Sequence, residues 1–357
     1  RSNTRRKKIM KRGFALVMAS MMALSLTACG GNGSSATTAA DTSAADTKAE
    51  GTTAAAPADK IGLAGSGKEL IFTTGGDQGT YYGFGSVLAG QISDMTDTTV
   101  TAIVGKGSKG NIEAMDAGDA QLGFVQSDVM AYAYNGTNLF DGAKVDGFST
   151  VAALYMEQVQ IVTLNPDIKT VADLKGKTVS VGDSGSGVYF NALDCLGAYG
   201  LTIDDITPTY QSFGDSVEAM QDGKIDAAFI VAGAPTTAVT SLAATRKVYL
   251  VELDDEHIDK LIETSPYYSK YTIAKDAYGL DADATTVAVG AVVVARDDVD
   301  ENDIYNVVAG IYDSIDTLGH DKKNELDLDF AASVTAVPYH KGAAKYFAEK
   351  GLTVPTK

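Results

Sequence analysis

The chain has 357 residues, 45% of them hydrophobic, and a formal net charge of −17 at pH 7. Residues 1–28 hold seven Lys and Arg and no acid, so the remaining chain sets 22 basic residues against 46 acidic ones, a balance of −24. So acidic a chain argues against nucleic acid as a partner and favours a soluble monomer.

The amino-terminal segment, residues 1–28, indicates a lipoprotein signal peptide. Basic residues precede an apolar block from Phe14 to Leu26, which is too short to span a bilayer, and Ala28-Cys29 follows. A basic region, a short apolar region and small residues at the cut are typical of a secretory signal. The sequence Leu-Thr-Ala-Cys resembles the lipobox of bacterial lipoproteins, which implies cleavage before Cys29 and lipidation of its sulfur. A plain signal peptide with a chance cysteine is the alternative.

Residues 29–66 are mostly Gly, Ser, Ala, Thr and Asp, with little to bury. Such a composition cannot offset the entropy of ordering a chain, so we expect a flexible tether. Together with the leader it predicts an extracytoplasmic protein, lipid-anchored to the outer face of the cytoplasmic membrane. The second cysteine, Cys195, falls in an apolar helical pattern and is expected to be an unpaired core residue.

The first folded unit predicts a strand, a glycine turn and a helix. The strand covers Leu70 to Thr74, and Gly75, Gly76 and Gly79 follow it. After Thr80, apolar residues recur at helical spacing. Backbone N–H groups at such a helix start point at a bound anion. Thr80 either caps the helix or offers its hydroxyl to a ligand, and an ordinary β–α turn is the alternative.

Further β–α units follow, and this alternation predicts a parallel α/β sheet. Strands are expected at 99–104 and 121–125, each followed by a helix. In open sheets of this kind, ligands bind at the carboxyl ends of the strands. Those ends are the polar, small-residue segments 74–80, 105–111 and 126–127.

The central and carboxyl-terminal parts predict a second lobe and two connections to the first. The apolar stretch 148–163 is expected to form two strand pieces with a lobe crossing between them. A second strand, glycine turn and helix covers 178–199, and the residues Gly233-Ala234-Pro235 are expected to open another helix, with Pro235 in its first turn. The other expected elements are strands at 207–211, 227–231 and 286–294 and helices from 215, at 300–318 and at 341–350.

This arrangement predicts two lobes that close on a small molecule. The first lobe is expected to comprise residues 67–155 and 255–357, and the second residues 156–254.

The motifs and their order resemble the TAXI family, the extracytoplasmic solute receptors of TRAP transporters. The similar segments are Gly76-x-x-Gly79-Thr80-Tyr81-Tyr82, Asn111-x-x-x-Met115 through Asp128, Leu154-Tyr155-x-Glu157, Asp173 to Lys177, Val181-Gly182-x-x-Gly185-Ser186-Gly187, Asp222 to Ala227, and Ala232-Gly233-x-Pro235. The resemblance runs from about residue 68 to the end. It implies a two-lobed α/β structure of the type II periplasmic-binding-protein fold. It also implies capture of a small carboxylate or amino acid, glutamate or 2-oxoglutarate-like, for a TRAP membrane permease.

By position, the resemblance implies a set of ligand contacts. They are Gly76, Thr80, Tyr81, Tyr82, Ser108, Asn111, Gln126, Ser127, Ser184, Gly185, Ser186, Gly187, Val188, Gly233 and Pro235. Asp77 stands where small residues are common in the family, so a carboxylate is added at the site.

No arginine clamp is expected, because Arg246 and Arg296, the two arginines after the leader, lie in surface-like settings. Helix N-termini and hydroxyls are instead expected to hold the carboxylate. One of Tyr81 and Tyr82 would cover the ligand's carbons, the other lying in the core. Asp77 or Glu157 would pair with an amino group, and for Glu157 an ion pair with Lys169 or Lys175 is the alternative.

Enzymatic chemistry, metals and cofactors are not expected. The near P-loop Gly62-x-x-x-x-Gly67-Lys68 continues with Glu69 and precedes a strand, so it does not fit a nucleotide site. None of His257, His320 and His340 has the setting of a general base or the spacing of a zinc ligand. The acidic run 254–259 indicates a solvated helix face, with a calcium site as the alternative. An extracytoplasmic enzyme on the same fold, using Asp77, Glu157 or Tyr82, is the second hypothesis for function.

Overall fold

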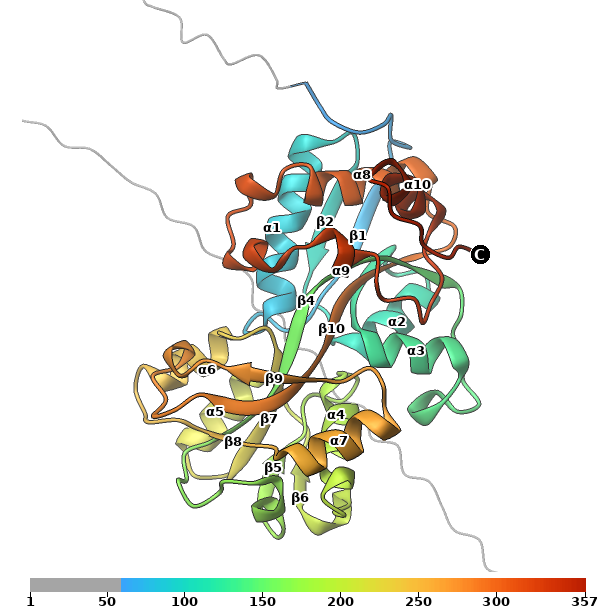
Figure 1. Ribbon diagram of the computed structural model, residues 1–357. Helices are drawn as coiled ribbons and strands as arrows, with labels where there is room; N and C mark the ends of the chain where they lie inside the picture. The colour runs from blue at the N-terminus through green and yellow to red at the C-terminus, as the bar shows by residue number, and fades with distance from the viewer. Residues whose placement is uncertain (1–58) are drawn as a thin grey trace, which may run out of the picture. The chain divides into compact units, whose positions relative to one another are not determined.

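The computed structural model describes residues 59–357 (Figure 1). The expected signal peptide, the lipidation site Cys29 and residues 29–58 of the expected tether lie outside the described residues. Within 59–357, no helix combines the length and the apolarity needed to cross a bilayer.

A ten-stranded mixed sheet organises the structure, with a main strand order of β2-β1-β3-β10-β4-β7-β5-β6. In each half, three parallel strands are followed by an antiparallel one: β2-β1-β3 then β10, and β6-β5-β7 then β4. The two halves therefore repeat one strand pattern. The antiparallel strand of each half, β10 in one and β4 in the other, also belongs to the connection between the halves. This is the type II periplasmic-binding-protein fold, and the α/β, two-lobed prediction is confirmed.

The first lobe contains β1 to β3 and packs helices on both faces of its half of the sheet. Its strands and helices are β1 (Glu69–Thr73), α1 (Thr80–Met95), β2 (Thr99–Ile103), α2 (Ser108–Asp116), β3 (Leu122–Gln126), α3 (Ser127–Asn135), α8 (Glu301–Tyr312), α9 (Leu328–Ala331) and α10 (Lys341–Glu349).

The second lobe has the same layering. Its elements are β5 (Thr178–Ser180), α4 (Val188–Ala198), β6 (Thr207–Thr209), α5 (Phe213–Gln221), β7 (Ala227–Ala232), α6 (Thr237–Ala243), β8 (Tyr249–Val251), α7 (Asp255–Thr264) and β9 (Ser269–Ile273). The expected division at residue 254 differs from this arrangement, because Ile258, Leu261 and Ile273 pack into the second lobe's core.

Two long strands connect the lobes: β4 (Phe148–Thr163) and β10 (Ala284–Arg296), which run side by side through both halves (Figure 1). The expectation of two strand pieces at 148–163 is wrong, since β4 is one continuous strand of 16 residues. Its residues are buried almost throughout, Glu157 and Gln158 included, because sheet and helices cover both of its faces. The polar residues that suggested a break therefore lie inside the protein.

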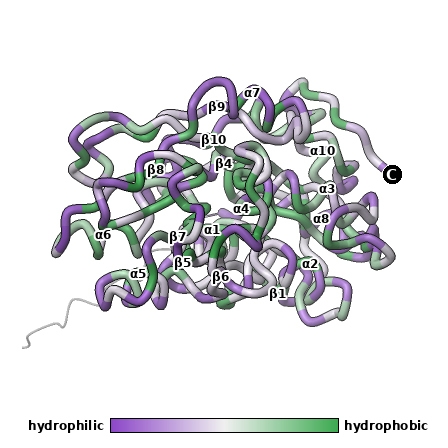
Figure 2. The backbone as a smooth tube through the Cα atoms, turned by 90° about the horizontal axis from the view of Figure 1, so that it is seen from below, coloured by the Kyte–Doolittle hydropathy of each residue, from purple (hydrophilic) through white to green (hydrophobic). Residues whose placement is uncertain are grey.

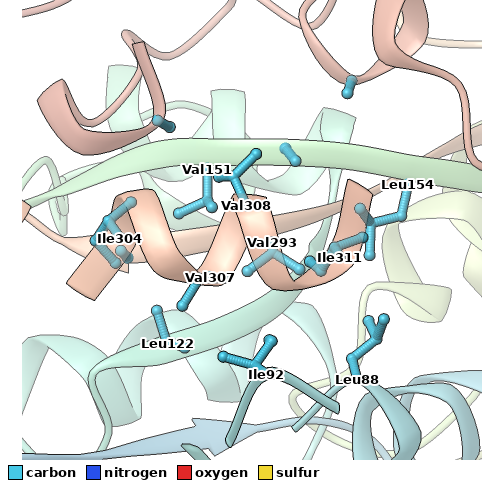
Figure 3. Packing of buried hydrophobic residues seen from close by; sticks show 14 of the residues in the cluster. Leu88, Ile92, Leu122, Val151, Leu154, Val293, Ile304, Val307, Val308 and Ile311 are labelled. Carbon is cyan, nitrogen blue, oxygen red and sulfur yellow. The ribbon is translucent and has the colours of Figure 1, made fainter. Parts of the chain in front are cut away.

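The cores explain why these helices form where they do. In the first lobe, Leu88 and Ile92 of α1 and Ile304, Val308 and Ile311 of α8 belong to one buried cluster over the sheet, and Val308 lies beside Val151 of β4 (Figure 3). This spacing of three and four residues places one apolar face of each helix against the strands. Figure 2 shows the hydrophobic segments gathered on the interior strands and the hydrophilic ones in the outer turns.

Residues 60–66, expected to belong to the tether, are held against the first lobe. The backbone N–H of Leu63 donates to Asn306 of α8 at 2.7 Å, and Ser66 donates to the buried carboxylate of Asp303. Ile61 forms a bridge with Thr96. Ile61 and Leu63 are the large apolar residues of this segment, and the Gly-, Ser- and Ala-rich composition around them makes the whole stretch look like a tether.

Candidate ligand-binding site

A pocket of about 690 Å³, partly open to solvent, lies where the carboxyl ends of strands from both lobes meet. The first lobe contributes the turns after β1 and β2 and the end of β3, and the second contributes the turn after β5, the start of α5 and the end of β7. Its lining residues are Gly75, Gly76, Asp77, Gln78, Gly79, Thr80, Tyr81, Gly105, Lys106, Gly107, Ser108, Gln126, Glu157, Asp183, Ser186, Gly187, Val188, Ser212, Phe213, Gly214, Val231 and Ala232.

Four helices begin at this pocket: α1, α2, α4 and α5. No side chain caps the N-termini of α1, α2 or α4, whose N-cap residues are Gly79, Gly107 and Gly187. Orphan N–H groups and the helix dipoles together make such ends favourable for an anion. No arginine is among the lining residues, and Lys106 is the one basic side chain there. The described pocket therefore offers an anion main-chain donors in place of an arginine clamp.

The two lobes are in direct contact around the pocket. Thr80 Oγ1 donates to the carbonyl of Gly233 at 3.0 Å, and the N–H of Gly110 donates to the carbonyl of Gly185 at 2.8 Å. Thr80 is thus neither a helix cap nor a free hydroxyl, because its hydroxyl is used to bridge the lobes. The structure describes the closed form of the cleft.

Gly187 lies tightly against side chains of the opposite lobe. A Cβ on Gly187 would lie 2.1 Å from Oε1 of Gln126 and 2.8 Å from Oγ of Ser108, both in the first lobe. Gly187 has an ordinary helical φ of −70°, so close approach, and not backbone conformation, requires glycine here. Gln126 Oε1 and Ser186 Oγ are buried in the pocket wall without a hydrogen-bond partner among the described residues.

Glu157 of β4 is the buried carboxyl group of the pocket, with an exposed fraction of 2%. The hydroxyl of Tyr81 donates to its Oε2 at 2.5 Å, and the Tyr81 ring stacks on Phe124 with centroids 4.6 Å apart. Burial raises the pKa of Glu157 to about 8, although the Tyr81 hydrogen bond opposes the shift. The alternative of an ion pair with Lys169 or Lys175 is wrong, since Glu157 lies inside and Lys175 pairs with Asp205.

The structure brings ten of the expected contact residues into the pocket wall: Gly76, Asp77, Thr80, Tyr81, Ser108, Gln126, Glu157, Ser186, Gly187 and Val188. Seven others lie outside it: Tyr82, Asn111, Ser127, Ser184, Gly185, Gly233 and Pro235.

Several of the seven have structural partners instead. Asn111 Nδ2 donates to the carbonyls of Thr74 and Phe124, which holds the ends of β1 and β3. Ser127 Oγ accepts from the N–H of Gly290 at 2.9 Å. Their side chains support the strand ends from behind.

Pro235 does not open a helix, because it follows a cis peptide bond and α6 begins at Thr237. The expectation for its first-turn position is wrong.

The start of α5, Ser212 to Gly214, also lines the pocket, although the predicted contact residues do not include it. Ser212 caps α5 by accepting from the N–H of Asp215 at 3.1 Å, and Gly214 lies against Gln78 of the first lobe. The signal was present in the sequence: Ser-x-x-Asp after a strand marks a helix start at the same edge of the sheet.

A second buried contact between the lobes lies behind the pocket. Asn191 of α4 donates to Oδ2 of Asp128 of α3 at 3.1 Å, and Tyr132 pairs with Ser265 at 2.9 Å. Asp128 is fully buried, and burial together with the nearby Asp194 raises its pKa to about 7.

We expect the free energy of unfolding to fall as pH rises from about 4 toward 7, because Asp128 stays protonated in the folded state over this range. The folded state keeps a proton that the unfolded state releases near the ordinary pKa of Asp, so the native state binds more protons in this window. The slope is at most about 1.4 kcal/mol per pH unit for each such group. Denaturant unfolding of wild type and Asp128→Asn at pH 4.5, 6 and 7.5 measures it. A variant with the same pH dependence as wild type would contradict the assignment.

The other expectations for single residues can be compared directly. Cys195 is buried and unpaired, as predicted, and burial raises the pKa of its thiol. Arg296 pairs with Asp298 at the end of β10. His257 stacks on Tyr199 and pairs with Asp254, so it is more enclosed than a solvated position. Among residues 59–357, no group of three or more potential ligands is arranged to hold a metal ion.

A family profile matches most of the chain. The profile of the NMT1-like family matches residues 72–351. A protein of Escherichia coli (strain K12), provisionally named an aliphatic sulfonates-binding protein, is 43% identical over 70 residues, which are 20% of this chain and 22% of that protein. The match therefore spans about a fifth of this relative's length.

Solved structures give more distant likenesses. The alkanesulfonate-binding protein SsuA from Xanthomonas axonopodis pv. citri, bound to MOPS, is 17% identical, with a TM-score of 0.46 over 78% of this chain and 83% of that one. The periplasmic aliphatic sulphonate binding protein SsuA from Escherichia coli is 18% identical, with a TM-score of 0.42 over 79% and 90%.

Proposed function

Since the chain belongs to the NMT1-like family, we propose that it is an extracytoplasmic receptor that closes its two lobes on a small organic anion. One observation carries the proposal: four helix N-termini, two from each lobe, begin at one pocket. A carboxylate is the preferred head group because the pocket offers hydroxyls and main-chain donors suited to it. A sulfonate is the second candidate, suggested by the name of the Escherichia coli relative.

The resemblance to TAXI receptors supports a finer proposal for the partner and location. We propose delivery of the solute to a TRAP permease by a lipoprotein anchored through Cys29. Uptake in reconstituted vesicles distinguishes a TRAP permease from an ATP-driven one, because a TRAP permease needs an ion gradient and no ATP. Metabolic lipid labelling that is lost in Cys29→Ala supports the anchor, and unchanged labelling opposes it.

A thermal-shift screen of carboxylates, sulfonates and amino acids tests the receptor itself. A ligand at a hundred times its dissociation constant stabilises the folded state by about 2.7 kcal/mol, which raises the melting temperature. Recovery of that ligand unchanged supports a receptor. Turnover would favour the alternative, an extracytoplasmic enzyme on the same fold, and the absence of any stabilising compound would oppose both ligand classes.

Replacing Ser186 by alanine is expected to weaken ligand binding by about 1–3 kcal/mol, the usual cost of leaving a buried polar group without its partner. Ser186 Oγ is buried in the pocket wall and has no partner among the described residues, so it is available to a bound anion. Calorimetry gives the change in affinity. Ser184→Ala is the matched control, since Ser184 is exposed and lies outside the lining. Equal affinities for both variants would exclude Ser186 as a contact.

A further inference from the structure

The pocket has an acceptor side as well as a donor side. Glu157 accepts from Tyr81 through Oε2, and no described residue donates to its other oxygen, Oε1. Gln126 also lines the pocket, 2% exposed, and its amide oxygen is buried without a partner. A buried acceptor without a donor costs about 1–3 kcal/mol, so the Gln126 amide oxygen is poorly satisfied by the described residues, and the second Glu157 oxygen is not engaged by any of them.

A ligand that is only an anion offers no donor to the oxygens of Glu157 and Gln126. The helix N-termini satisfy its oxygens, but a carboxylate next to Glu157 meets a second acid in a desolvated space. A neutral Glu157 can donate one hydrogen bond, yet a glutamine would do so without the risk of charge repulsion. A ligand that carries an ammonium group beside its carboxylate supplies donors for Glu157 and Gln126 and an anion for the helix ends.

Resting on the proposed function, we infer that Glu157 is the receptor for a ligand ammonium group and that the pocket selects amino acids over plain carboxylates of the same size. Tyr81 acts as a positioning residue. Its hydroxyl holds one oxygen of Glu157, and its ring is fixed against Phe124. The other oxygen is thereby left for the ligand.

Binding should then release a proton. Burial raises the pKa of Glu157 to about 8, so the group is mostly neutral at pH 7 in the free protein, and an ammonium ion next to it favours the carboxylate. The charged or titratable groups around Glu157 are Tyr81 from α1, Asp128 from α3, Tyr155 on its own strand and Lys322 from the 3₁₀ turn Asp321–Glu325. Asp77, Asp183 and Lys106 lie exposed at the pocket rim.

Calorimetry on matched pairs, L-glutamate with glutarate and L-leucine with 4-methylpentanoate, tests the inference. Measurements at pH 7 in phosphate and in Tris reveal proton release, because the two buffers differ in ionisation enthalpy. We expect an amino acid to bind at least tenfold more tightly than its partner and to release close to one proton. Its affinity should rise with pH from 6 to 8, by at most tenfold per unit, whereas that of a plain anion should fall.

Glu157→Gln is the decisive variant, and Tyr81→Phe is its companion. The first should weaken binding of the amino acid at least tenfold and abolish proton release. It should leave the affinity for the matched compound without the amino group within about threefold of wild type. The second keeps the ring and should shift the pH profile with a smaller loss of affinity. Deamino acids that bind as tightly as amino acids would overturn the inference and leave the receptor intact. If neither class binds, the proposed carboxylate function fails, and the inference fails with it.

Discussion

Replacing Gly187 by valine is expected to reduce ligand affinity at least a thousandfold while changing the free energy of unfolding by less than about 1 kcal/mol. A Cβ at this position would lie 2.1 Å from Gln126 and 2.8 Å from Ser108 across the cleft. Either the lobes stay apart, or the Gln126 amide moves into the ligand's space. Both outcomes remove the closed pocket, which corresponds to about 4 kcal/mol or more at 1.4 kcal/mol per tenfold.

Stability is expected to change little because the clash exists only between lobes, and because the φ of Gly187 suits any residue. Calorimetry with the ligand from the screen gives the affinity, and thermal unfolding gives the stability. Gly197→Val is the matched control, since it lies on the same helix and no atom is within 4 Å of its added Cβ. If the ligand affinity of Gly187→Val were within tenfold of wild type, close approach of the lobes at this turn would not be needed for binding.

Replacing Phe124 by alanine is expected to lower the free energy of unfolding by about 3–5 kcal/mol, the range for a large aromatic ring removed from a core. Phe124 is fully buried on β3 and packs against Phe72 at 5.0 Å and Tyr81 at 4.6 Å between centroids. The same change removes the surface on which Tyr81 rests, so we also expect weaker ligand binding.

Urea unfolding measures the effect, and Tyr210→Ala serves as the control. Tyr210 is 51% exposed, so loss of its ring should cost less than about 0.5 kcal/mol. A loss below about 1.5 kcal/mol for Phe124→Ala would show that the core around the first turn rearranges to fill the cavity.

The positions of the turns could be predicted from the sequence, but their partners could not. Glycine after a strand and apolar residues at helical spacing mark the segment 75–80, and the carboxyl-end rule places such segments at one edge of the sheet. The hydrogen bond between Tyr81 and Glu157 joins residues 76 positions apart, and no local pattern encodes it. Thr80 shows the same limit, because its partner is a carbonyl of the other lobe.

Local composition also misleads where a few residues decide the outcome. The segment 60–66 continues a stretch rich in Gly, Ser, Ala and Thr, yet the Ile61 bridge to Thr96 and the hydrogen bond from Leu63 to Asn306 attach it to the first lobe. Glu157 and Gln158 interrupt an apolar stretch, yet the strand continues through them, since Glu157 accepts from the Tyr81 hydroxyl and Gln158 from the N–H of Ala234. Average polarity predicts solvent contact, whereas individual partners determine it.

The attachment of residues 60–66 has a mechanical consequence. Because these residues are fastened to helix α8 and to the loop after α1, a pull from the amino-terminal side reaches the first lobe alone. Relative to that attachment the first lobe is fixed, so in the proposed closing motion the second lobe is the one that moves.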